Sequence, residues 1–301
     1  MIAALFPGQG SQSVGMARDL YERSTAAQRV LDDAEAALPG LLSLMFEGPA
    51  DELQLTANQQ PALVAAGAAA YAAYLERGGE RPSYAAGHSL GEFTAHVATG
   101  TLQLGDAVAL VRKRGEYMQK VVPAGEGAMA AILKVTPDVV RAACDATEGV
   151  VEVANLNAPG QTVISGRAGP VAAAGERLKG EGARVIPLKV SAPFHCALMQ
   201  PAADALARGL AATTFHPPLY PIVCNVTAEV LASVDHAPSL LTQQVTSAVR
   251  WTQSVERLAA LGVTRWIEFG SGKVLSGLVA RILDDPDTHA VVDGATLEEA
   301  S

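Results

Sequence analysis

A serine between two glycines is the first pattern in this sequence that could perform covalent chemistry. The segment Gly87–Gly91, GHSLG, follows a short apolar run, Ser83–Gly87, and precedes a helical stretch that ends near Gly100. Glycine on each side permits a tight strand-to-helix turn that lifts a serine hydroxyl clear of a sheet. Amides at the start of the next helix can stabilise an oxyanion. Although the pentapeptide alone occurs by chance, this context favours Ser89 as a nucleophile over a glycine-rich packing turn.

A serine hydroxyl needs a base, and histidine is the usual one. The histidines are His88, His96, His195, His216, His236 and His289. The first lies within the turn itself, with its side chain expected to point away from the hydroxyl, and the last three lie in loop-like or polar segments. His195 follows a predicted strand, Arg184–Val190, where an irregular loop can hold a base over the sheet. His96 lies two helical turns after the serine, where packing or capping is expected. The residues alone favour His195 only modestly over His96.

The elements that must position these residues alternate between strand and helix, which predicts a mostly parallel sheet covered on both faces. The predicted strands of this frame are Ile2–Phe6, Ser83–Gly87, Tyr220–Asn225 and Arg265–Phe269. The predicted helices are Val14–Tyr21, Thr25–Leu38, Ala57–Arg77, Asp106–Val121, Ala197–Ala212, Pro238–Val245, Thr252–Leu261 and Val274–Ile282. The Ala-rich stretch Pro61–Leu75 is too short to span a membrane and is interpreted as a buried core helix.

The middle third of the chain has a different order of elements, β-α-β-β-α-β, which is the ferredoxin-like pattern. Its predicted elements, in order, are Gly127–Leu133, Pro137–Thr147, Val150–Asn155, Gln161–Ser165, Gly169–Glu181 and Arg184–Val190. The expected fold class is therefore α/β. Residues 1–124 and 196–301 form a larger α/β-hydrolase-like domain with a mostly parallel sheet, and residues 125–195 form an inserted ferredoxin-like subdomain.

Composition argues against several classes of protein. The 301 residues are 49% hydrophobic and 18% charged, which is typical of a globular chain. Twenty-two basic and 31 acidic residues give a net charge of −9 with no basic run, so nucleic acid is not an expected partner. The three cysteines lie far apart, which favours reduced thiols in the cytoplasm over disulfides or a zinc site. The N-terminus has no basic segment before its short apolar run, so neither a signal peptide nor a membrane partner is expected.

Five motifs occur in a fixed order along the chain. They are Phe6–Gln12 (FPGQGSQ), Gly87–Glu92 (GHSLGE), Arg114–Gln119 (RGEYMQ), Asn155–Gln161 (NLNAPGQ) and Phe194–Met199 (FHCALM). Together they closely resemble the bacterial malonyl-CoA:acyl carrier protein transacylases of fatty acid synthesis, from about residue 2 to about residue 283.

The resemblance implies a role for each matching residue. Ser89 matches the acylated serine of the family, and His195 matches its catalytic histidine. Gln9 and Leu90 match the positions whose backbone N–H groups form the oxyanion hole. Arg114 matches the arginine that pairs with the free carboxylate of malonyl, a task that suits the planar fork of a guanidinium. Without the resemblance, Arg114 would be interpreted as a solvated charge within a short basic stretch.

Two further residues and one departure complete the implied site. Gln244 matches a glutamine whose backbone carbonyl orients the histidine ring, giving a Ser-His dyad without an acidic third member. Met118 matches a position that lines the pocket. Loop capping is the alternative for Gln9 and Gln244, and core filling is the alternative for Met118. Phe194 departs from many free-standing members and resembles malonyl-specific acyltransferase domains of polyketide synthases, because a bulky ring disfavours an α-methyl branch.

The resemblance also implies partners. Malonyl-CoA and an acyl carrier protein are the expected partners, and the phosphopantetheine thiol belongs to the carrier, so no metal or other cofactor is expected. Fatty acid synthesis is favoured, although polyketide synthesis stays open, and a monomer is expected. Basic residues at which an acidic carrier could dock are Lys134, Lys179, Arg184 and Lys189. The substitution of Ser271 into a glycine-rich segment, 270–273, is expected to have no functional consequence.

Two other classes of protein remain alternatives. A serine esterase or thioesterase shares the turn and the oxyanion hole, but it usually carries an acidic residue in chain order between serine and histidine. None of the candidates Asp106, Asp138 and Asp145 lies in a convincing loop at a strand end. A docking protein with a dead site is the second alternative, and the intact set of serine, histidine and arginine argues against it.

Overall fold

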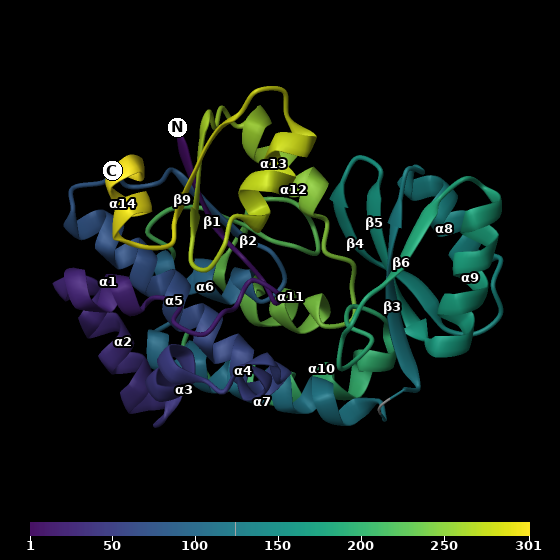
Figure 1. Ribbon diagram of the computed structural model, residues 1–301, viewed down its shortest axis with the longest axis horizontal. Coiled ribbons are helices and arrows are strands. Elements are labelled where there is room, and N and C mark those ends of the chain that lie inside the picture. Colours follow the sequence, from purple (N-terminus) through teal and green to yellow (C-terminus); the bar gives the residue numbers. More distant parts are fainter. Residues whose placement is uncertain (124) are drawn as a thin grey trace.

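The computed structural model describes residues 1–123 and 125–301, and a parallel sheet forms the larger part of its framework. The strands of this sheet are β1 (Ile2–Phe6), β2 (Tyr84–Gly87), β7 (Ile222–Val223), β8 (Arg265–Phe269) and β9 (Asp287–Val291). They lie in the order β7-β2-β1-β8-β9, and every neighbouring pair is parallel. Helices cover both faces of the sheet (Figure 1). The expected α/β class with a parallel sheet is confirmed.

Alternation along β1 separates the two hydrophobic cores of the large domain. The side chains of Ile2, Ala4 and Phe6 belong to one core, and those of Ala3 and Leu5 belong to the other. Helices that supply buried residues to the first core include α1 (Arg18–Arg23), α2 (Thr25–Ala37), α5 (Thr56–Glu76), α6 (Gly91–Ala98), α7 (Leu104–Val121) and α10 (Gln200–Ala211). Helices that supply the second core are α12 (Trp251–Ala260) and α13 (Val274–Ile282).

Helix α5 is buried along nearly its whole length, as the Ala-rich sequence predicts. Seventeen of its 21 residues are buried, and its strongest helix contacts are with α7 and α2. Small side chains allow these neighbours to approach from several sides. Among the helices of the described residues, none is both long and apolar enough to cross a lipid bilayer.

The middle of the chain forms a second, antiparallel sheet with its own hydrophobic core. Its elements, in chain order, are β3 (Gly127–Leu133), α8 (Pro137–Asp145), β4 (Val151–Ala158), β5 (Gln161–Arg167), α9 (Ala168–Gly180) and β6 (Arg184–Pro187). The sheet order is β4-β5-β3-β6, which is the ferredoxin-like arrangement. Figure 1 shows this unit at one end of the molecule. The predicted domain boundary falls on residue 124, which lies outside the described residues.

Several short elements differ from the sequence-based prediction. The helix expected from Val14 begins only at Arg18, because Gly15 and Ala17 adopt left-handed φ values of 89° and 61°. The strand expected to reach Asn225 ends at Val223, since the Cys224 N–H donates to Glu229 outside the sheet. Elements that were not predicted are α3 (Leu41–Glu47), α4 (Ala50–Gln54), β9 and α14 (Gly294–Ala300). The predicted helix at residues 238–245 is α11 (Ala237–Gln244).

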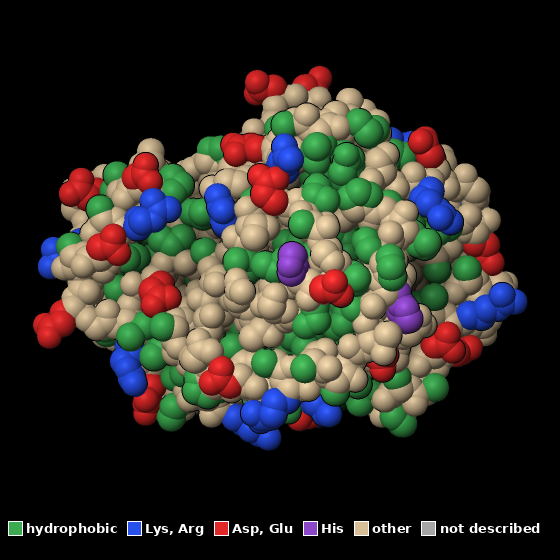
Figure 2. Space-filling model, turned by 180° about the vertical axis from the view of Figure 1, so that it is seen from behind, with side chains coloured by type: hydrophobic (Ala, Val, Ile, Leu, Met, Phe, Trp, Pro, Cys, Tyr) green, Lys and Arg blue, Asp and Glu red, His purple; other side chains and the backbone are tan. Residues whose placement is uncertain are grey.

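Charges of both signs are mixed on the surface. Figure 2 shows Lys and Arg side chains among Asp and Glu side chains on the face seen from behind, with no continuous basic area on that face. This distribution fits the net charge of −9.

Candidate active site

Ser89 occupies a strained turn between β2 and α6. Its φ is 52°, in the left-handed region that non-glycine residues rarely adopt. A Cβ atom on Gly87 would lie 1.9 Å from the carbonyl carbon of Gly91, and one on Gly91 would lie 1.9 Å from the carbonyl oxygen of Phe6. Both glycines are therefore required for the turn. The strand-turn-helix context predicted for Ser89 is present.

The imidazole of His195 lies within hydrogen-bonding distance of the serine. Ser89 Oγ is 2.7 Å from His195 Nε2. On the other side of the ring, Nδ1 donates to the backbone carbonyl oxygen of Gln244 at 2.8 Å. Because a carbonyl can only accept, the proton lies on Nδ1 and the Nε2 lone pair faces the serine hydroxyl. A carbonyl thus occupies the place that an acidic side chain takes in a triad.

The environment keeps His195 neutral. Burial and, to a smaller extent, the positive charge of Arg114 lower the pKa of His195 to about 3, against the raising effect of the Gln244 carbonyl. An imidazole that is already unprotonated at neutral pH can accept a proton directly from Ser89.

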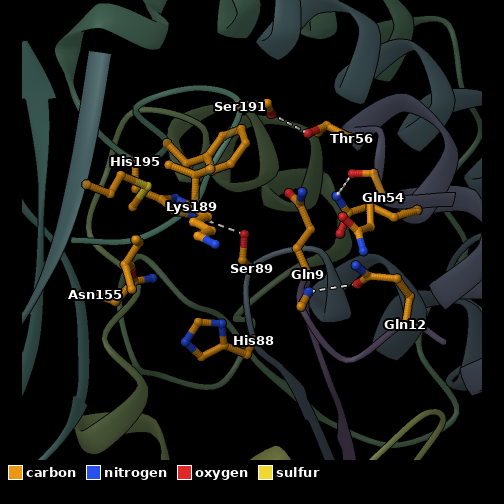
Figure 3. Close-up of a pocket in the computed structure, with 16 residues that line it drawn as sticks. Gln9, Gln12, Gln54, Thr56, His88, Ser89, Asn155, Lys189, Ser191 and His195 are labelled. Carbon is orange, nitrogen blue, oxygen red and sulfur yellow. Dashed lines mark hydrogen bonds between the residues drawn. The ribbon is translucent and has the colours of Figure 1, made fainter. Parts of the chain in front are cut away.

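Ser89 and His195 both line a cavity of about 380 Å³. Figure 3 shows Ser89 facing His195, with Gln9 on the opposite side of the serine. Apolar side chains on the wall include Met129 and Phe194. The cavity therefore combines an apolar wall with a few polar groups around the nucleophile, as small-molecule sites commonly do.

Arg114, on α7, reaches the serine, although it is not among the residues that line the cavity. It is 1% exposed, and its Nη2 lies 3.4 Å from Ser89 Oγ. Nη1 donates to Gln60 Oε1 at 2.9 Å, and Nη2 donates to Gln244 Oε1 at 3.0 Å. Burial lowers the pKa of Arg114 to about 10, and the charge of Glu92 opposes this shift. The guanidinium is therefore a fixed positive charge beside the nucleophile and not a solvated surface group.

The remaining predicted site residues lie around this centre. Gln9 is on the cavity wall, and Leu90 directly follows the serine. Within residues 1–123 and 125–301, neither backbone N–H of these two residues donates to a protein acceptor. Met118 is 1% exposed and is not among the residues that line the cavity. Its sulfur lies 3.8 Å from Gln60 Nε2. Core filling, the alternative interpretation of Met118, describes this position.

The two histidines nearest Ser89 in the sequence, His88 and His96, do not bond to its hydroxyl. The ring of His88 points away from the hydroxyl, and its Nε2 lies 2.8 Å from Asn157 Oδ1 (Figure 3). His96 is fully buried against Phe215 and is not on the cavity wall. In the part of the chain that the structure describes, no group of three or more histidine, cysteine or acidic residues could hold a metal ion.

Sequence reasoning missed three residues that support the site. Gln60 contacts Arg114, and its position within an apolar helix was an available signal. Asn225 accepts from the Ser89 N–H and donates to the Gly87 carbonyl, both at 2.6 Å, so it braces the turn. Its place just after a strand was the signal. Glu92, the last residue of the serine motif, is buried beside Gln244.

Comparison with known proteins agrees with this geometry. The family described as "Acyl transferase domain" matches residues 4–273. A malonyl CoA-acyl carrier protein transacylase of Bacillus subtilis is 49% identical, and the alignment covers 99% of this chain and 96% of the relative.

Solved structures of malonyltransferases have the same fold as this chain. An acyl carrier protein S-malonyltransferase of Vibrio cholerae superposes with a TM-score of 0.97 at 43% identity, covering 100% of this chain and 99% of that one. A malonyl-transacylase in complex with its type II PKS acyl-carrier protein gives 0.96 at 41% identity, covering 99% and 98%. With identity and coverage at these levels, this chain belongs to the malonyl CoA-acyl carrier protein transacylases.

Proposed function

We propose that this chain transfers the malonyl group of malonyl-CoA to the phosphopantetheine thiol of an acyl carrier protein through an ester on Ser89. One observation carries the proposal. Ser89 Oγ lies 2.7 Å from the neutral base His195 and 3.4 Å from the buried guanidinium of Arg114. A nucleophile, its base and a fixed positive charge thus meet at one point, which suits an acyl group with a free carboxylate.

Acylation begins with transfer of the Ser89 proton to His195 Nε2. The serine oxygen attacks the thioester carbonyl, and the N–H groups of Gln9 and Leu90 stabilise the oxyanion. Collapse of the tetrahedral intermediate breaks the carbon–sulfur bond, and the departing CoA sulfur takes the proton from His195. The malonyl carboxylate pairs with Arg114 throughout this step.

Transfer reverses these events with a different thiol. The phosphopantetheine thiol of the carrier loses its proton to His195 and attacks the Ser89 ester carbonyl. The serine oxygen leaves and regains its proton from His195. The Gln244 carbonyl holds the ring in the same orientation during both half-reactions.

Finer aspects of the proposal concern pathway and setting. We assign the reaction to fatty acid synthesis, in the cytoplasm, by a monomer. Three buried cysteines without disulfides suit a reducing compartment. We divide the chain into a catalytic domain, residues 1–124 and 196–301, and a subdomain, residues 125–195, because the second sheet has its own core.

Mass spectrometry of the intact protein tests the covalent step. Incubation with malonyl-CoA should add one malonyl group per chain in the wild type and none in Ser89→Ala. Adding a carrier or a pantetheine thiol should then remove the label and place malonyl on the thiol. Release of malonate to water in preference to the thiol would instead identify a hydrolase, and an absence of label would identify a protein with a dead site.

Replacing the arginine tests acyl selectivity. Arg114→Ala leaves the malonyl carboxylate without a partner in a desolvated site, a loss of about 3–5 kcal/mol in transfer of malonyl. Transfer of acetyl, which has no carboxylate, should persist or rise. An equal loss for both acyl groups would assign Arg114 a purely structural role.

A further inference from the structure

A buried carboxylate lies one amide group away from Arg114 and takes no part in the proposed reaction. Glu92, in the first turn of α6, is 1% exposed. Its Oε2 accepts from the Asn225 backbone N–H at 3.1 Å and from Gln244 Nε2 at 2.7 Å. Burying a carboxylate is energetically unfavourable, so a buried carboxylate beside the active site is expected to have a function.

The Gln244 side chain connects this carboxylate with Arg114. Gln244 Nε2 donates to Glu92 and also to the Ser89 backbone oxygen at 3.0 Å, whereas Oε1 accepts from Arg114 Nη2 at 3.0 Å. An ionised carboxylate and a carbonyl can only accept, so the amide cannot turn round without losing both bonds. The oxygen of Gln244 is therefore held toward the arginine.

Both side chains that accept from the Arg114 Nη atoms at about 3 Å are neutral amides, so the orientation of the guanidinium depends on how firmly each amide is held. Among the described residues, no carboxylate lies within ion-pair distance of the guanidinium, whose Nη1 donates to Gln60 Oε1. Gln60 in turn donates to the amide oxygen of Gln9 at 3.3 Å. Two amide oxygens face Arg114, and only that of Gln244 belongs to an amide held by a charged group, the Glu92 carboxylate.

We propose that Glu92 is a positioning residue for acyl-group selectivity. Its carboxylate fixes the Gln244 amide, and that amide holds Arg114 in the orientation that pairs with the carboxylate of the acyl group. This inference rests on the proposed role of Arg114 in the transfer reaction. If Glu92 only supported Asn225, and through it the Ser89 turn, replacing Glu92 would reduce transfer from every acyl donor equally.

The substitution Glu92→Gln tests the proposal, because it keeps the size of the side chain while removing the charge and adding a donor. The Gln244 amide can then turn and present its N–H₂ group to Arg114. We expect the KM for malonyl-CoA to rise, kcat to change little, and the malonyl-to-acetyl ratio of kcat/KM to fall about tenfold, the effect of one hydrogen bond to a charged group. Equal losses for malonyl and acetyl would overturn the proposal.

Glu268→Gln is the matched control. Glu268 is also fully buried, and it accepts from the backbone N–H groups of Leu275 and Ser276 at the start of α13. Removing its charge should leave the malonyl-to-acetyl ratio unchanged, even if the protein becomes less stable.

A double-mutant cycle shows whether Glu92 acts through Arg114. In the Arg114→Ala background, Glu92→Gln should leave the ratio unchanged, and a further drop would contradict the proposal. An unchanged ratio in Arg114→Ala alone would remove the proposed role of the arginine and this inference together. An unchanged ratio in Glu92→Gln alone would remove only this inference.

The wild-type enzyme supplies a second test that stands even if Glu92→Gln fails to fold. Burial raises the pKa of Glu92 to about 7, against the lowering effects of hydrogen bonds and of Arg114. The groups that face it are Arg114 from α7, Gln244 from α11, and Cys224 and Asn225 from the segment after β7. Because the ionised form fixes the amide, the malonyl-to-acetyl ratio should fall as pH drops through 7. A ratio constant between about pH 5.5 and about pH 8.5 would overturn the proposal.

Discussion

At the residue scale, the active site brings together side chains that are far apart in the chain. Ser89 follows β2, His195 follows β6, and Arg114 lies on α7. The serine could be predicted locally, because a turn between two glycines is a local geometry. The histidine could not, since the residues alone favoured His195 only modestly over His96. Its contact with Ser89, 106 positions away, exists only in the folded chain.

Phe194 is expected to exclude branched acyl groups. Its side chain is 9% exposed and lines the cavity beside His195. In Phe194→Ser, the space released should admit an α-methyl group, and the ratio of methylmalonyl to malonyl transfer should rise about tenfold or more. Competition between the two CoA thioesters, resolved by mass spectrometry of Ser89, measures this ratio. Phe46→Ser, which loses aromatic packing against Tyr21 and does not line the cavity, should not change it. An unchanged ratio in Phe194→Ser would assign selectivity to other residues.

At the element scale, the short helix α6 carries polar side chains into the core on two successive turns. Glu92 at its start has hydrogen-bond partners, but neither ring nitrogen of His96 bonds to any described residue. The ring packs edge-on against Phe215 at a centroid distance of 6.1 Å. Buried polar atoms without hydrogen-bond partners lower the free energy of unfolding. Helix α6 therefore carries one buried polar side chain that supports the site, Glu92, and one that reduces stability, His96.

His96→Leu should therefore stabilise the protein. Removing the unpartnered nitrogens is expected to raise the free energy of unfolding by about 1–3 kcal/mol, measured by urea denaturation at neutral pH. His236→Leu, at an exposed position, should change it by less than about 0.5 kcal/mol. A loss of stability in His96→Leu would show that the ring is well accommodated.

The same variant should be less sensitive to acid. Burial lowers the pKa of His96 to about 3, whereas a histidine in the unfolded chain has its ordinary pKa of about 6.5. Below 6.5 the unfolded chain binds a proton that the folded chain cannot, so stability is lost as pH falls from 6.5 toward 3. His195 has the same effect, and it remains in His96→Leu. The decline on acidification should thus become shallower without disappearing.

At the scale of the whole molecule, the cavity lies between the two sheets. Gln9 and Ser89 come from the large domain, and Met129 and Asn155 come from the antiparallel sheet. The two parts are joined close to the site, where the Leu156 N–H donates to the Val249 carbonyl at 2.9 Å. The position of the subdomain therefore shapes the opening through which substrates must enter.

This arrangement separates the basic residues that could bind an acidic carrier. Lys189 is exposed on the cavity edge, and its neighbour Leu188 donates to Met129. Arg184 pairs with Leu133, four residues farther along β3, which is roughly 13 Å away. Lys134 and Lys179 are exposed toward that same far end of the subdomain. Lys189 is therefore the strongest candidate for carrier docking.

Charge reversal tests this choice. Lys189→Glu should raise the KM for the carrier protein about threefold to tenfold, and less so at high salt, because it repels an acidic partner. Lys179→Glu at the far end, where the lysine pairs with Glu176 at 2.7 Å, should leave the KM unchanged. Equal carrier affinity in Lys189→Glu and wild type would exclude this docking site.

The sequence by itself determined the class of fold, the ferredoxin-like order and the turn that presents Ser89. These follow from local information: strand and helix periodicity, and the glycines required at positions 87 and 91. Short or polar elements such as α3 and β9 escaped prediction, since packing against the rest of the protein stabilises them more than their own residues do.

Only the tertiary structure decided which polar residues serve the nucleophile. The sequence alone suggested that Arg114 is a solvated surface charge, whereas in the structure its guanidinium is buried. Gln60, Asn225 and Glu92 belong to the hydrogen-bonded network around Ser89 and Arg114. The physical reason is that a hydrogen bond depends on distances of about 3 Å between atoms that the chain places many residues apart. The type of a residue fixes which hydrogen bonds its side chain can donate or accept, but only the folded structure determines which partners it reaches.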